Sequence, residues 1–113
     1  RGRALAVRRP PRGLMGGLWE LPGDDLAARE APARGLRRAL RERVGLDVGP
    51  LRKAGSVEHV FSHRRLRLYV YRCEAQGGRV RLAGPDAHRW LAPSRLNRLP
   101  QASLTRKALE LLL

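Results

Sequence analysis

The chain has 113 residues, which is enough for one domain with a hydrophobic core and too few for two. Its formal net charge is +14, with 24 Lys and Arg against 10 Asp and Glu, which excludes an acidic or neutral protein. This balance favours a polyanionic partner, because each Lys/Arg–phosphate contact releases condensed counterions, although codon bias in a GC-rich genome would also enrich arginine.

Several familiar features are absent from the sequence. A single cysteine, Cys73, excludes a disulfide framework and a metal cluster built from cysteine. No apolar segment approaches the roughly 20 residues that span a bilayer, and no signal peptide is visible. We therefore expect a monomer in the cytoplasm without a membrane partner. Because the chain begins without methionine, we expect residues 1–113 to be a single domain of a longer protein.

The first half of the chain predicts two short strands and a basic helix. Residues 4–7 form an apolar run that a pair of prolines ends, and residues 18–21 follow a glycine-rich stretch. Pro32 suits the first turn of a helix, and Gly45 suits its C-terminal cap. The opposite face of this helix is rich in arginine. Its apolar residues share one face at helical spacing: Ala33, Leu36, Leu40 and Val44.

The second half predicts a series of strands. Residues 65–71 alternate strictly between apolar and polar side chains, which is the period of a half-buried strand. Residues 51–60 form a less regular strand before it. A turn at residues 76–78 should lead into a strand at 79–82, and a short strand is expected at residues 89–91.

The C-terminal residues predict a closing helix. Ser103 is a good N-cap, and an apolar stripe follows it at Leu104, Ala108, Leu111 and Leu112. Trp19 and Trp90 each lie in an otherwise apolar strand, so we expect both in the core. The order of elements predicts an α/β (α+β) fold, with a mixed sheet and a helix on each side.

The spacing of several residues around the basic helix resembles the Nudix box, G-x5-E-x7-R-E-U-x-E-E-x-G-U, in which U is aliphatic. Gly23 is followed by six residues rather than five, then by Glu30, and after seven more by Arg38. The resemblance implies a Nudix-like α/β/α sandwich.

The chemistry of this box is degenerate. Active Nudix hydrolases hold Mg²⁺ with glutamates at positions that fall here on Ala39, Glu42 and Arg43. A hard divalent cation needs a cluster of oxygen ligands, and the arginines beside Glu42 would repel it. We therefore expect no bound metal, no catalytic residue and no enzyme activity from this chain alone.

A second informative stretch joins the two predicted strands at residues 57–66. Phe61 could stack on a base, Ser62 could hydrogen-bond a base edge, and the arginines at positions 64, 65 and 67 could hold phosphate. On pattern alone, the stronger interpretation is that Phe61 fills the core, Ser62 caps a turn, and His63 is solvated. Arg64, Arg65 and Arg67 would then form a solvated strand face.

Four segments together are similar to the C-terminal domain of MutY-type adenine DNA glycosylases. They are GLMGGLWELPG, V-x-H-x-F-S-H-x-x-L, RW and a terminal P-x-x-x-x-x-R-K helix, and they cover nearly the whole chain. The resemblance implies a Nudix-like, MutT-related domain that recognises 8-oxoguanine opposite adenine in base excision repair. It further implies that Phe61, Ser62 and His63, with His59 beside them, form the lesion-reading loop.

The same resemblance implies the partners of the chain. These are double-stranded DNA containing 8-oxoguanine and an N-terminal glycosylase domain of the same chain, in a bacterial protein. The family's 4Fe–4S cluster and its catalytic carboxylates belong to that N-terminal domain, so no cofactor is expected in this fragment.

Two other functions stay open. One is an active Nudix pyrophosphohydrolase acting on an oxidised nucleotide, with ligands recruited elsewhere, such as Glu30 and Glu58. The other is a general basic module that binds nucleic acid without lesion preference. His59 and His63 share strand parity, but a metal site needs a third ligand that the sequence does not supply at a suitable spacing.

Overall fold

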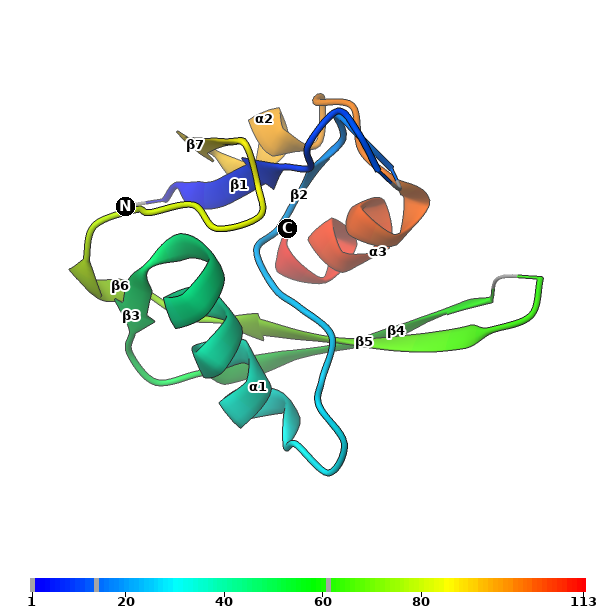
Figure 1. The fold of residues 1–113 in the computed structure, drawn as a ribbon, viewed down its shortest axis with the longest axis horizontal. Coiled ribbons are helices and arrows are strands. Elements are labelled where there is room, and N and C mark those ends of the chain that lie inside the picture. The colour runs from blue at the N-terminus through cyan, green and yellow to red at the C-terminus, as the bar shows by residue number, and fades with distance from the viewer. Residues whose placement is uncertain (1, 14, 61) are drawn as a thin grey trace.

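A computed structural model describes residues 2–13, 15–60 and 62–113 of the chain (Figure 1). Within these ranges, the elements follow one another as β1 (Ala4–Arg8), β2 (Trp19–Glu20), α1 (Pro32–Ala39), the π-helical turn η1 (Leu40–Val44), β3 (Leu46–Val48), β4 (Arg52–Val60), β5 (Arg65–Arg72), β6 (Ala75–Gly78), β7 (Ala87–Leu91), α2 (Pro93–Leu96) and α3 (Ser103–Leu112).

The strands pair in three groups. β1 lies between β2 and β7 and is antiparallel to both, β3 pairs with β6, and β4 pairs with β5. A parallel bridge between Trp19 and Gln101 makes the arrangement mixed. Both α-helical and β-strand layers are therefore present, as the sequence predicts.

β1 is the centre of the core, because alternate side chains on a strand point to opposite faces. On one face, Leu5 and Val7 pack with Leu40 and Val44 of η1. On the other face, Ala6 packs in a second cluster with Leu96 of α2 and Leu109 of α3. Each fully buried aliphatic side chain contributes roughly 1.5–3 kcal/mol to folding. Helices therefore cover the two faces of β1, which confirms the predicted sandwich (Figure 1).

The helix around α1 forms largely as its sequence predicts. Pro32 stands at the first helical position, and Gly45 ends η1 in the left-handed conformation with φ 76°. Leu40 and Val44 are buried on the apolar face. The last turn, Leu40–Val44, is a π-helix, which is wider than an α-helical turn, and it still places both Leu40 and Val44 in the core.

Three predictions are wrong in detail. Residues 79–82 form no strand, because the N–H groups of Arg81 and Ala83 donate to the carbonyls of Val44 and Arg43 at the end of η1 instead. Ser103 is the first residue of α3 rather than its cap. Of the predicted apolar stripe of α3, Ala108 is buried, but the other buried residues of this helix are Thr105 and Leu109.

β4 and β5 form a long hairpin that extends away from the rest of the molecule (Figure 1). α3 packs against the base of this hairpin, where Leu111 lies over Gly55. Gly55 has φ 147° and lies at a register irregularity, so a side chain there would be strained and crowded. None of the helices in the described residues has the length and apolar character needed to cross a membrane.

Candidate functional site

The degenerate Nudix box surrounds one guanidinium group, that of Arg38. Its Nε donates to Glu30 Oε2 at 2.8 Å, and one terminal nitrogen donates to Glu30 Oε1 at 3.0 Å. The other terminal nitrogen donates to Glu42 Oε1 at 3.1 Å and lies 3.8 Å from Asp24 Oδ2. The carbonyl of Asp25 also accepts a hydrogen bond from Arg38 at 3.0 Å. Arg38 thus holds the loop before α1 against the helix.

Arg43 enters the same cluster from the next turn. A terminal nitrogen of Arg43 lies 3.8 Å from Asp24 Oδ2, so one carboxylate lies between two guanidinium groups. Ala39, at i−4 from Arg43, is buried in the core with 1% of its surface exposed. Two positions that carry glutamate in the Nudix box are therefore occupied by a buried methyl group and by a cation.

The electrostatics of the cluster are dominated by the pair of Glu30 and Arg38. Hydrogen bonds from Arg38, followed by one from the backbone N–H of Ala27, lower the pKa of Glu30 to about 2. In turn, the hydrogen bonds that Arg38 donates to Glu30 and, to a smaller extent, to Glu42 raise the pKa of Arg38. Glu30 is therefore ionised at every physiological pH.

The described residues do not fit the divalent cation of an active Nudix hydrolase. The acids nearest the family positions, Asp24, Glu30 and Glu42, already face guanidinium groups. Across the described ranges, no cluster of three or more His, Cys, Asp or Glu side chains could hold a metal ion. Oxygen ligands are what Mg²⁺ requires, and here they are neutralised by arginine.

The predicted lesion-reading residues lie at or near the tip of the β4–β5 hairpin. Ser62, His63 and Arg64 are exposed between the two strands. Phe61 lies outside the described residues. The tip lies well away from α1 in Figure 1, so the structure does not bring these residues together with the Nudix box.

The charged residues behind the tip divide into paired and unpaired groups. Arg67 donates to Glu58 Oε2 at 2.8 Å across the hairpin, and this hydrogen bond lowers the pKa of Glu58. Arg64 and Arg65 are exposed and form no ion pair with the described residues. Of the three predicted phosphate contacts, Arg64 and Arg65 are therefore the most available.

His59 faces α3 rather than the tip. Lys107 Nζ lies 3.2 Å from His59 Nδ1 and 3.4 Å from the carbonyl of Glu58. Lys107 of α3 therefore lies within hydrogen-bonding distance of both the ring and the backbone of this part of β4. Sequence reasoning missed Lys107, and it missed Asp24, whose position directly after Gly23 was the available signal.

With the geometry established, similarity to known proteins identifies the family. The sequence pattern of the NUDIX domain family matches residues 1–111. This chain belongs to the NUDIX domain family. A crystal structure of a MutT NUDIX hydrolase from Burkholderia pseudomallei superposes with a TM-score of 0.87 at 27% identity, covering 99% of this chain and 89% of that one.

Two relatives correspond to the two classes of protein considered from the sequence, a nucleotide diphosphatase and a DNA glycosylase. The 8-oxo-dGTP diphosphatase of Proteus vulgaris is 39% identical over 65 residues, which are 58% of this chain and 58% of the relative. The human adenine DNA glycosylase is 36% identical over 92 residues, which are 77% of this chain but 16% of the relative. The chain thus spans only part of the length of each of these relatives.

These comparisons contradict our prediction that the chain alone is not an enzyme. The diphosphatase relative and the MutT NUDIX hydrolase structure support an enzyme. The prediction gave too much weight to the substitutions at Ala39 and Arg43 and too little to the rest of the chain, which matches the NUDIX domain pattern over residues 1–111.

The ion pair of Glu30 with Arg38 predicts an acid-sensitive contribution to stability. Because the folded pKa of Glu30 is about 2 and its ordinary value is 4.5, the contribution is complete above about pH 4.5 and is lost as the pH falls toward 2. In Glu30→Gln, the free energy of unfolding should change less over this range than in the wild type, as measured by urea unfolding at each pH.

The matched control is Glu110→Gln, an exposed acid of α3 that has no ion pair with the described residues. It should keep the wild-type dependence on pH. Identical profiles for Glu30→Gln and the wild type would contradict the assignment.

Proposed function

We propose that this chain hydrolyses 8-oxo-dGTP. The observation that carries the proposal is the match to the 8-oxo-dGTP diphosphatase of Proteus vulgaris, within a family pattern that extends from residue 1 to residue 111. The net charge of +14 suits a substrate with a triphosphate group. The B. pseudomallei structure supports the same class of chemistry through its fold.

Glu42 is the residue on which this proposal depends most. It stands at the one family glutamate position of the helix that still carries a carboxylate. Its side chain is 61% exposed, whereas that of Glu30 is 11% exposed, so a substrate can reach Glu42 more easily. Arg38 contacts Glu42 through Oε1 alone, which leaves Oε2 available to a ligand.

A second function is favoured by the hairpin. The hairpin extends away from the body of the molecule (Figure 1), and Ser62, His63, Arg64 and Arg65 at its end are exposed, which suits contact with a duplex. The match to the human adenine DNA glycosylase supports recognition of 8-oxoguanine in DNA as this second candidate. In this function, Phe61, Ser62 and His63 would read the lesion, and Arg64 and Arg65 would hold phosphate.

The two functions differ in the ligand that carries the oxidised base. Both need to distinguish 8-oxoguanine from guanine, and oxidation converts N7 from an acceptor into a donor. Turnover of a free nucleotide therefore tests the first function, and discrimination between duplexes tests the second.

Release of pyrophosphate from 8-oxo-dGTP should be measurable and should exceed release from dGTP, with Mg²⁺ supplied as the complex with the triphosphate, because the described residues form no metal site of their own. Glu42→Gln should abolish it, because the variant loses the exposed carboxylate of the cluster while keeping the size of the side chain. Glu110→Gln should leave the rate unchanged. Absence of release from the wild-type chain with Mg²⁺ or Mn²⁺ would refute the first function.

Ser62→Ala should reduce discrimination between 8-oxoguanine and guanine duplexes by about threefold to tenfold, the worth of one hydrogen bond. Competition binding measures this ratio. Ser56→Ala, an exposed serine of β4, provides the control on the same hairpin. If Ser62→Ala preserves the ratio, the serine does not read the base.

Arg65→Ala should weaken binding to lesion and normal duplexes alike, and the slope of log K against log salt should flatten by about 0.9. Titrations at several salt concentrations give the slope. Arg98→Ala, an exposed arginine after α2, should leave it unchanged. An effect confined to lesion DNA would mean that Arg65 contacts the base.

A further inference from the structure

Two hollows lie beside each other on the segment that follows β6. The first has a volume of about 530 Å³ and the second about 510 Å³, and both are lined by Gly78 and Arg79. Neither hollow includes a residue of the hairpin tip, and the first touches the Arg38 cluster only through Glu42. Apart from Glu42, the residues that line the two hollows take no part in either proposed function.

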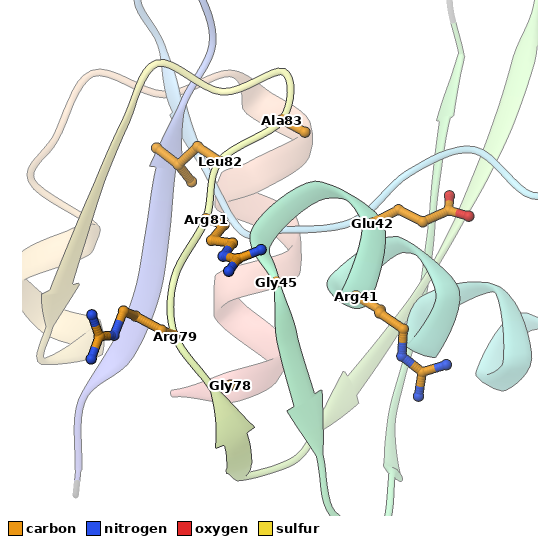
Figure 2. A pocket seen from close by; sticks show the side chains of 8 residues that line it. All are labelled: Arg41, Glu42, Gly45, Gly78, Arg79, Arg81, Leu82 and Ala83. Atoms are coloured by element: carbon orange, nitrogen blue, oxygen red, sulfur yellow. The ribbon is translucent and has the colours of Figure 1, made fainter.

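The first hollow is strongly cationic. Arg41, Arg79 and Arg81 line it, and Figure 2 shows them on two facing segments, the end of the helix and residues 78–83. Arg41 is paired with Asp47 at 3.1 Å. Arg79 and Arg81 are exposed and form no ion pair with the described part of the chain. Two guanidinium groups are therefore available to an anion.

The acid that lines the first hollow does not cancel these charges. Glu42 is turned away from Arg79 in Figure 2, and its carboxylate accepts a hydrogen bond from Arg38. In Figure 2, Arg81 extends toward Gly45 and Arg79 to the other side of the segment, so a strand that crosses residues 78–83 could contact both guanidinium groups.

The second hollow contains an aromatic surface. Trp90 lines it and is 40% exposed, which contradicts our prediction that this tryptophan lies in the core. Trp90 pairs with Leu5 across β7 and β1, and Leu46 and Val80 line the same hollow. His88, two residues before Trp90 on the same face of β7, is also exposed. A flat ring, an imidazole and apolar neighbours suit a stacked nucleobase.

We propose that the two hollows form one groove that binds an unpaired stretch of a nucleic acid strand. A base stacks on Trp90 in the second hollow, and the neighbouring phosphates lie against Arg79 and Arg81 in the first. The groove is open, and the polar groups lining it lie at its surface, so it suits a strand that passes through rather than a free nucleotide held on all sides. This inference is independent of the proposed hydrolysis and of lesion reading.

Binding of a labelled oligothymidylate, measured by fluorescence anisotropy, tests the groove. Trp90→Ala should weaken binding about tenfold, whereas Trp90→Phe, which keeps an aromatic ring, should retain most of the affinity. The double variant Arg79→Gln/Arg81→Gln should flatten the salt slope by about 1.4, which is 0.7 for each lost contact to a single strand. Arg12→Gln, an exposed arginine that lines neither hollow, is the control and should leave both quantities unchanged.

Three results would overturn the proposal. The first is equal affinity of Trp90→Ala and the wild type, with circular dichroism showing both folded. The second is competition by thymidine triphosphate at the same nucleotide concentration as the oligomer, which would assign the groove to free nucleotides. The third is an equal loss of duplex and single-strand binding in Trp90→Ala, which would show that the groove does not select an unpaired strand. The groove is tested by binding of an oligomer to variants at Trp90, Arg79 and Arg81, and hydrolysis is tested by turnover of a free nucleotide, so the two proposals fail separately.

Discussion

The interaction on which the site depends is the contact of one guanidinium group with three carboxylates. Arg38 binds Glu30, Glu42 and Asp24 together. Exposed ion pairs contribute little to stability, but a network around a carboxylate with 11% exposure is held more firmly. Through Glu30 and the carbonyl of Asp25, this network fixes the loop between β2 and α1 against the helix. Asp24, Glu30 and Glu42 therefore lie around a single guanidinium group.

The same contact affects whether the carboxylates of the Nudix box can bind a cation. Arg43 occupies a position that carries glutamate in the Nudix box, and it lies near Asp24. The cluster therefore has carboxylates, but they are compensated by arginine rather than left free for a cation. Glu42, the most exposed of the three, is the acid that a cation bound to a nucleotide could still reach. Hydrolysis of 8-oxo-dGTP and recognition of 8-oxoguanine in DNA would both use an anionic ligand, which the net charge of +14 favours.

Local patterns predicted the elements whose partners lie close in sequence. Pro32, the apolar face of the helix and Gly45 specify α1 and η1, and strict alternation specifies β5. The patterns failed for segments whose conformation depends on a partner that is distant in the sequence. Residues 79–82 alternate like a strand, but their N–H groups bond to the end of η1, more than 30 residues earlier. The cluster was predicted only in part, because Asp24 reaches Arg38 through the folded loop rather than through helical spacing.

The strand that does not form leaves an edge of the sheet open. Because Arg81 and Ala83 bond to the helix end, β7 pairs only with β1 among the described strands. Trp90, in this edge strand, is 40% exposed, and Arg79 lines the hollow beside it. The backbone hydrogen bonds of residues 81 and 83 thus hold a segment that carries two arginines near an exposed aromatic ring, a combination that suits a nucleic acid strand.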